Sequence, residues 1–291
     1  MLAEMTEAEP TTIEYTAIPT SSATLSGHAL GIDIGGTGIK AAVVDLESGQ
    51  LVTGRVRQPT PQPATPDAVL GVVGAVVREL EASGALPPQM SAGAGFPSVI
   101  RAGDALTAPH GVQAWIGMSV AHVLSERLGR PVAVLNDADA AGVAEMAYGA
   151  GRGNTGVVLL LDLGTGIGTA LFRSGELVPN MQLGHIQFHG QDAELRVSPA
   201  ARKRRNLSWK TWGREFNELL AAYEDYLWPD LIILGGGMVK DFSKFSEFLS
   251  TNVQLVPAIL ANTAGIVGAA RVAAGGGPAA GIWDGLATET R

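Results

Sequence analysis

One structural unit occurs twice in this sequence: a hydrophobic strand, a turn of glycine and threonine, and a second strand that runs back beside the first. The first copy is GIDIGGTGIK over residues 31–40, after which Val43 and Val44 resume the hydrophobic pattern. The second copy has the apolar strand 156–162, the turn 163–168 and a returning strand over 169–172. Because one unit recurs in each half of the chain, the sequence predicts a duplicated fold with two lobes.

The glycine turns are candidate anion sites, because glycine lets backbone N–H groups approach an anion without interference from a Cβ atom. Asp33, inside the first strand, is suitably placed to hold a hydrated Mg²⁺ beside that anion. A third turn, residues 235–237, also follows a strong strand. Three such turns at the carboxyl ends of strands indicate a long phosphate-bearing ligand. The alternative is three ordinary turns, the first with a buried aspartate.

Strands and helices alternate along the rest of the chain, which is typical of an α/β protein. Hydrophobic periodicity predicts a helix capped by Asp67 and ended by Gly84. Further helices are predicted over residues 117–128, 138–148, 212–227 and 263–274. Further strands are predicted over residues 91–96, 131–135 and 230–234.

Composition restricts the function. Hydrophobic residues make up 46% of the 291 residues, enough for a sizeable core, and there is no cysteine for disulfides or thiolate chemistry. The net charge of −8 argues against a nucleic-acid-binding face. No apolar run approaches the roughly 20 residues of a membrane helix, and no signal peptide is evident. We expect a cytoplasmic protein with a mobile arm over residues 1–27 and a flexible tail over residues 275–291.

Asn136 and Asp137 follow a predicted buried strand and are candidates for the chemistry. The Asp137 carboxylate can accept a proton from a substrate hydroxyl that the neighbouring amide fixes. The alternative is a helix N-cap, since both residue types cap well. Both roles can hold, one for each residue.

An amide and an imidazole, Gln182 and His185, lie three residues apart, and Asp192 and Glu194 follow closely. Such a mixture of amide, imidazole and carboxylate suits a polyhydroxylated ligand. A lone histidine is more often structural, so the alternative for His185 is a structural role.

The motifs occur in the order found in the ROK family of sugar kinases, which this sequence resembles from about residue 30 to about residue 272. The resemblance rests on residues 33–37, 136–137, 161–168, 183–185 and 231–237. A narrower likeness, to the polyphosphate glucokinases and polyphosphate/ATP glucomannokinases of that family, rests on residues 178–180, 192–194 and 262–268.

The resemblance implies an actin-like ATPase fold (ribonuclease H-like) with two lobes around a central cleft. The small lobe would be residues 28–137 and the large lobe residues 138–274, whose last helix packs back on the small lobe. It implies a homodimer that transfers a phosphoryl group from polyphosphate or ATP to the 6-hydroxyl of glucose and mannose, with Mg²⁺. The alternative is a sugar-binding regulator of that family or a non-catalytic sugar-binding module.

The resemblance also implies roles for particular residues. Asp137 would be the general base and would bind the sugar together with Asn136, Gln182, His185 and Glu194. The donor phosphates and nucleotide would be held by Asp33, Gly35, Gly36, Thr37, Lys40, Gly164, Thr165, Gly166, Gly235, Gly236 and Gly237. Two departures stand out: the family usually has Glu at the position of Gln182, and its cysteine-rich zinc motif is absent, so no structural zinc is expected.

Four consecutive cations, Arg202, Lys203, Arg204 and Arg205, stand out in an acidic chain. They are candidates for a groove that holds a polyphosphate chain where it leaves the cleft, because a long polyanion gains affinity at each phosphate that meets a cation. The alternative is a solvated helix end or loop.

Overall fold

Two five-stranded sheets with the same internal arrangement form the core of the protein in a computed structural model that describes residues 27–275. The strand order is β3-β2-β1-β4-β7 in the first sheet and β10-β9-β8-β13-β14 in the second. In each sheet an antiparallel meander is extended on one side by two parallel strands. The predicted repetition of strand, glycine turn and returning strand is therefore confirmed.

The elements have the following bounds. The first sheet contains β1 (His28–Ile34), β2 (Ile39–Asp45), β3 (Val56–Gln58), β4 (Ala92–Phe96) and β7 (Val132–Asn136). The second contains β8 (Val157–Leu163), β9 (Ile167–Arg173), β10 (Glu176–Val178), β13 (Leu231–Gly235) and β14 (Gln254–Pro257). Two small hairpins are β5 (Ile100–Arg101) with β6 (Asp104–Ala105), and β11 (Gln187–Phe188) with β12 (Gln191–Asp192). The helices are α1 (Pro66–Ala82), α2 (Val120–Leu128), α3 (Asp137–Tyr148), α4 (Ala193–Val197), α5 (Pro199–Arg204), α6 (Trp209–Leu227) and α7 (Ala264–Ala274).

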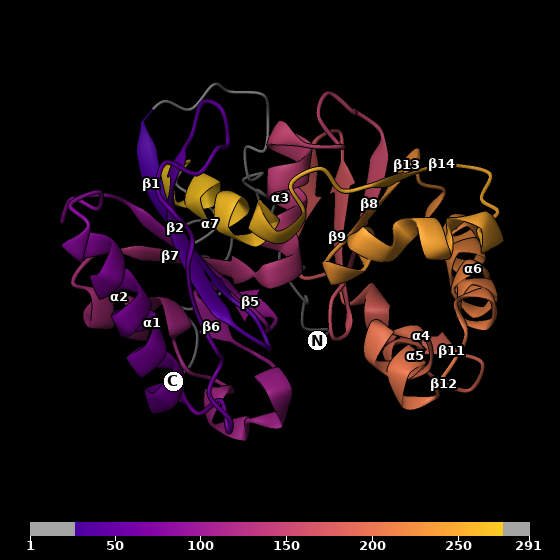
Figure 1. The fold of residues 1–291 in the computed structure, drawn as a ribbon, viewed down its shortest axis with the longest axis horizontal. Helices are drawn as coiled ribbons and strands as arrows, with labels where there is room; N and C mark the ends of the chain where they lie inside the picture. The colour runs from indigo at the N-terminus through magenta and orange to yellow at the C-terminus, as the bar shows by residue number, and fades with distance from the viewer. Residues whose placement is uncertain (1–26, 276–291) are drawn as a thin grey trace, which may run out of the picture.

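Helices α3 and α7 lie between the two sheets, as Figure 1 shows. Alternate strand residues point to opposite faces of a sheet, so Ala29 and Val158 face these helices while Leu30 and Leu159 face outward. The outer face of the first sheet is covered by α1 and α2, and that of the second sheet by α6. The protein therefore has five layers: one hydrophobic cluster surrounds the central helices on both sides, and one lies on the outer face of each sheet.

Glycines allow the central helices to approach closely. A Cβ atom added to Gly31 in β1 would lie 1.9 Å from the carbonyl oxygen of Ile266 in α7. One added to Gly268 in α7 would lie 1.7 Å from the carbonyl oxygen of Ala140 in α3. Because any side chain would collide with backbone there, glycine holds α7 against both the first sheet and α3.

Three helix starts differ by two residues or more from those predicted. Helix α1 begins at Pro66 after the N-cap residue Thr65, so Asp67 lies within the first turn and does not cap the helix, in keeping with the preference of proline for the first helical position. Helix α2 begins after a turn in which Gly117 has a φ of 77°. Helix α6 begins at Trp209, where the Ser208 hydroxyl accepts the Thr211 N–H.

The arm and tail predictions concern residues almost wholly outside the described range. Within residues 27–275, no helix combines the length and apolar character needed to cross a membrane.

Candidate active site

A cavity of about 1240 Å³ collects residues from both halves of the chain. Its lining includes the three glycine turns that follow β1, β8 and β13, together with the N-terminus of α3. The predicted site residues that line it are Asp33, Gly35, Gly36, Thr37, Lys40, Asn136, Asp137, Gly164, Thr165, Gly166, Gln182, His185, Glu194, Arg202, Lys203, Gly235, Gly236 and Gly237. The structure thus brings these residues into one cavity, although they come from distant segments of the sequence.

The first two glycine turns leave backbone donors available. Among the described residues, the N–H groups of Gly36 and Thr37 have no hydrogen-bond partner. In the second turn, the N–H groups of Thr165 and Gly166 also have no hydrogen-bond partner within residues 27–275. Successive free N–H groups in a turn form a concave anion site, so both turns are suited to phosphate oxygens.

The third glycine turn touches the second aspartate-bearing strand. Gly236 has a φ of 77°, and a Cβ atom added there would lie 2.5 Å from Oδ1 of Asp162. The turn therefore needs glycine both for its backbone conformation and for its close approach to β8.

Asp137 is the first residue of α3, and the residue before it acts as the cap. The side-chain Oδ1 of Asn136 accepts the N–H groups of Ala138 and Asp139 at 2.9 and 3.2 Å, and its Nδ2 donates to the carbonyl of Ser98 at 3.1 Å. The capping alternative therefore holds for Asn136. The carboxylate of Asp137 borders the cavity, and none of the described cations forms an ion pair with it.

The protein environment favours the protonated form of Asp137. Burial raises the pKa of its carboxyl group to about 7, and the negative charges of Asp162 and Asp33 contribute to the increase. Burial also raises the pKa of Asp162 to about 6, with Asp33 adding to the increase and Lys40 opposing it. A carboxylate with a pKa near neutrality is a better proton acceptor than an ordinary aspartate.

Asp162 was not predicted as a site residue. It is the penultimate residue of β8, just as Asp33 is the penultimate residue of β1. The signal was present, because the repeated motif carries an aspartate at the same place in both copies.

The carboxylates fit a hydrated Mg²⁺. Asp33, Asp137 and Asp162 supply oxygen atoms, the ligands that Mg²⁺ prefers, and their mutual repulsion raises the pKa of two of them. Within residues 27–275, no three His, Asp or Glu side chains converge closely enough to hold a metal directly. The residues therefore suit an ion that keeps its water and is shared with donor phosphates.

The other predicted sugar-binding residues, Gln182, His185 and Glu194, lie around the 3-10 helix η3 (Leu183–His185) and α4. Asp192 Oδ2 lies 2.8 Å from His185 Nδ1, which fixes one side of the imidazole ring. Glu194 Oε2 accepts the N–H of Ile167 at 2.9 Å, beside the second glycine turn. Gln182 and His185 are exposed to solvent at the cavity wall.

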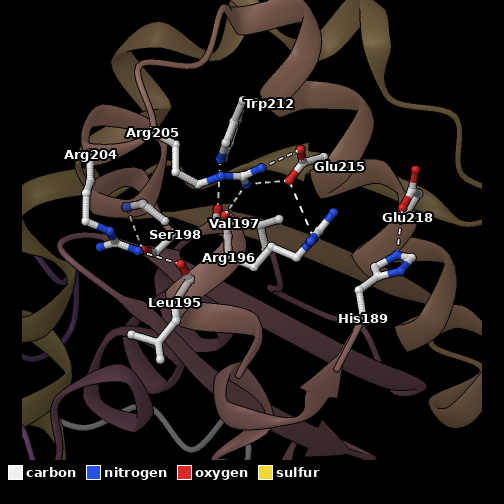
Figure 2. A network of polar contacts seen from close by, with 11 residues as sticks. His189, Leu195, Arg196, Val197, Ser198, Arg204, Arg205, Trp212, Glu215 and Glu218 are labelled. Carbon is white, nitrogen blue, oxygen red and sulfur yellow. Dashed lines mark hydrogen bonds and ion pairs between the residues drawn. The ribbon is translucent and has the colours of Figure 1, made fainter. Parts of the chain in front are cut away.

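The four consecutive cations do not act as one group. Arg202 and Lys203 line the cavity, whereas Arg204 and Arg205 are not among its lining residues. Arg204 donates to the Leu195 carbonyl at 2.6 Å, and Arg205 makes two hydrogen bonds to Glu215 at 2.6 and 2.9 Å (Figure 2). The reason is helical geometry, since successive residues of α5 point in different directions.

Two further buried acids support the site. Asp139 Oδ2 accepts the N–H of Asn180 at 2.8 Å, and Asn180 in turn makes two hydrogen bonds to the backbone of Ile100. Burial raises the pKa of Asp139 to about 7. Glu145, which is fully buried, accepts three backbone N–H groups, from Ala150, Ile259 and Leu260. The sequence signal was weak, because both are single acids in a helix of small residues.

Comparison with known proteins agrees with this geometry. The polyphosphate glucokinase of Mycobacterium tuberculosis is 42% identical to this chain over 267 residues, which cover 91% of this chain and 97% of that protein. The structure of the inorganic polyphosphate/ATP-glucomannokinase from Arthrobacter sp. strain KM matches with a TM-score of 0.81 and 45% identity, covering 84% of this chain and 97% of the other.

The fold extends to more distant proteins. A glucokinase from Streptomyces griseus in complex with glucose and AMPPNP has a TM-score of 0.71 at 24% identity, over 85% of this chain and 99% of that one. These structural neighbours have the actin-like ATPase fold. The family model described as "ROK family" matches residues 29–195, the segment that carries the first two glycine turns and the predicted sugar-binding residues. The chain therefore belongs to the ROK family.

Proposed function

We propose that this protein is a hexose kinase that transfers a phosphoryl group from inorganic polyphosphate or ATP to the 6-hydroxyl of glucose. The observation that carries the proposal is the position of Asp137, which borders the cavity that also contains the two turns with free N–H groups. The relatives named polyphosphate glucokinase and polyphosphate/ATP-glucomannokinase support it. The regulator alternative has less support.

In the proposed reaction, Asp137 accepts the proton of the 6-hydroxyl while that oxygen attacks the terminal phosphorus atom. The bond between this phosphorus and its bridging oxygen breaks, and the shortened polyphosphate or ADP leaves with the bond's electron pair. Asn136, Gln182, His185 and Glu194 hold the remaining sugar hydroxyls. Bound Mg²⁺ would neutralise donor charge, and Asp33 and Asp162 are the residues suited to hold it through water.

We propose that different glycine turns bind different parts of the phosphoryl donor. We assign the donor phosphates to the turns at Gly35–Thr37 and Gly164–Gly166, with Lys40 as their cation, and the nucleoside side to the turn at residues 235–237. A longer polyphosphate would continue toward Arg202 and Lys203, which line the cavity. Because Arg202 also stacks 3.6 Å from the centre of the Trp209 ring, Lys203 is the freer of these two cations.

Several wider features of the proposal rest on the family resemblance. Residues 28–137 and 138–274 would form the two lobes that close on the sugar, which excludes water that would otherwise accept the phosphoryl group. Mannose is proposed as a second acceptor, a homodimer as the assembly and the cytoplasm as the location.

A coupled assay of glucose 6-phosphate formation tests the function. The purified protein is given glucose with Mg²⁺ and either ATP or polyphosphate, and then the same mixtures with excess chelator. We expect turnover with at least one donor and loss of turnover with chelator. Absence of turnover with both donors would overturn the proposal, and full activity with chelator would overturn the metal requirement.

A further inference from the structure

His110 has an unusual backbone and lies against the first glycine turn. It sits in the 3-10 helix η1 (Pro109–Gly111), and its φ of 52° lies in the left-handed region. A non-glycine residue in this region costs free energy, and such residues cluster at binding and catalytic sites. The local fold therefore holds a histidine at this place against a conformational preference.

The contact with the turn is close. A Cβ atom added to Gly36 would lie 2.7 Å from Cε1 of the His110 ring, so the ring occupies the space that a side chain of residue 36 would fill. His110 also lines the main cavity. Among the described residues, neither ring nitrogen makes a hydrogen bond.

The turn itself is arranged to present donors. The Gly35 carbonyl accepts the Thr60 hydroxyl, and the Gly35 N–H donates to the Gly38 carbonyl at 3.2 Å. These bonds fix Gly35 and leave the next two N–H groups, of Gly36 and Thr37, without a described partner. Arg57 adds a cation nearby, since its Nη2 donates to the Thr37 carbonyl at 3.0 Å.

We infer that His110 binds a donor phosphate oxygen together with the Gly36 and Thr37 N–H groups, and so helps to set donor affinity. This inference rests on the proposed function, because the anion is the phosphate chain of the donor. An imidazole N–H can donate to a phosphate oxygen in either protonation state. Burial lowers the pKa of His110, so the ring is neutral before an anion arrives.

Binding of tripolyphosphate, measured by calorimetry without glucose, tests the inference in two variants. His110→Phe keeps a ring over Gly36 but has no donor, whereas His110→Asn lacks the ring but keeps a donor and tolerates the left-handed region. We expect His110→Phe to bind tripolyphosphate about tenfold or more weakly, since it loses a hydrogen bond to a charged group. His110→Asn should lose less affinity than His110→Phe.

His122→Asn is the matched control, since His122 is exposed on α2 and pairs with Glu126; it should bind tripolyphosphate as the parent does. Glucose affinity and the melting temperature of each variant check that the fold persists. If His110→Phe binds like the parent and His110→Asn binds worse, the ring only covers the turn and the inference fails. If the parent shows no kinase activity but His110→Phe still binds tripolyphosphate more weakly than the parent, the proposed function is overturned and the role of His110 in anion binding stands.

Discussion

Asp33 and Asp162 occupy the same position in the two repeated hairpins, but only Asp33 has a cation opposite it. Lys40 pairs with Asp33 in the register of β1 and β2, and its Nζ lies 2.6 Å from Asp33 Oδ2. Asp162 lies opposite Gly168. Lys40 acts on both carboxylates: it forms an ion pair with Asp33, and its charge lowers the pKa of Asp162.

Lys40→Met should weaken the use of both phosphate donors. The variant removes the cation beside the first glycine turn and leaves neighbouring carboxylates to repel the donor. A decrease of about tenfold or more in kcat/KM for ATP and polyphosphate is expected, because a hydrogen bond to a charged group contributes roughly 1.5–3 kcal/mol. Lys210→Met, at an exposed position of α6, is the control. Parent-like kinetics in Lys40→Met would contradict this role.

Lys203→Glu should raise KM for long polyphosphate and leave KM for ATP nearly unchanged. Lys203 lines the cavity and Arg204 does not, so Arg204→Glu on the same helix is the matched control. The affinity of the parent for polyphosphate should also fall steeply with salt, because each phosphate contact releases counterions. Steady-state kinetics at two salt concentrations measure both effects. Equal effects of the two variants would show that Lys203 holds no polyphosphate.

Asp139→Asn should change how stability depends on pH. Asp139 has a pKa of about 7 in the folded protein, against about 3.9 in an unfolded chain. The folded state therefore retains a proton that the unfolded state releases, and this group makes the protein less stable as the pH rises from about 4 to about 7. Asparagine does not ionise, so the variant should gain stability relative to the parent over that range.

Urea unfolding at pH 5 and pH 8 measures this difference. Each unit of pKa shift corresponds to about 1.4 kcal/mol. Asp225→Asn, on the surface of α6, serves as the control and should track the parent. The assignment fails if Asp139→Asn loses as much stability as the parent between the two pH values.

Gly268→Ala should destabilise the protein, because the new methyl group would lie 1.7 Å from the Ala140 carbonyl oxygen and would push α7 away from α3. Overpacking of this kind typically costs about 1–3 kcal/mol. Gly71→Ala in α1 is the control: a Cβ atom there meets nothing within 4 Å, and alanine favours a helix by about 1 kcal/mol over glycine. Thermal unfolding should therefore shift in opposite directions. An unchanged midpoint for Gly268→Ala would contradict the close packing described here.

Much of the fold could be predicted from local patterns. The apolar strands and their glycine turns identified the hairpins β1–β2 and β8–β9, because apolar runs and turn residues are local properties of the chain. Helix starts were less accurate: Thr65, not Asp67, is the cap of α1. Asp67 was predicted as the cap because aspartate is a favoured cap residue. Pro66 favours the first position of the helix, so the cap lies one residue before it, at Thr65.

The site residues that lie in a repeated motif or at the end of a strand could be predicted from the sequence. Those whose place in the site depends only on three-dimensional packing could not. Asp162 could have been found by comparing the two copies of the repeat. His110 and Glu145 had no such signal, because their roles depend on contacts with Gly36 and Leu260, far away in the sequence. The sequence could not show which of the four consecutive cations line the cavity, because neighbouring residues on a helix point in different directions; Arg202 and Lys203 do so.

The role of Asp137 as general base is the centre of this account, and Asp137→Asn tests it most directly. The measurement compares kcat of glucose phosphorylation in the parent and the variant, together with glucose affinity by calorimetry. We predict a loss of about 10² to 10⁴ in kcat, the usual contribution of a general base, with glucose binding retained. In the parent, kcat should fall as the pH decreases below about 7, the pKa of Asp137 in the folded protein, because the base must be deprotonated. Retention of most of kcat in Asp137→Asn would contradict the account.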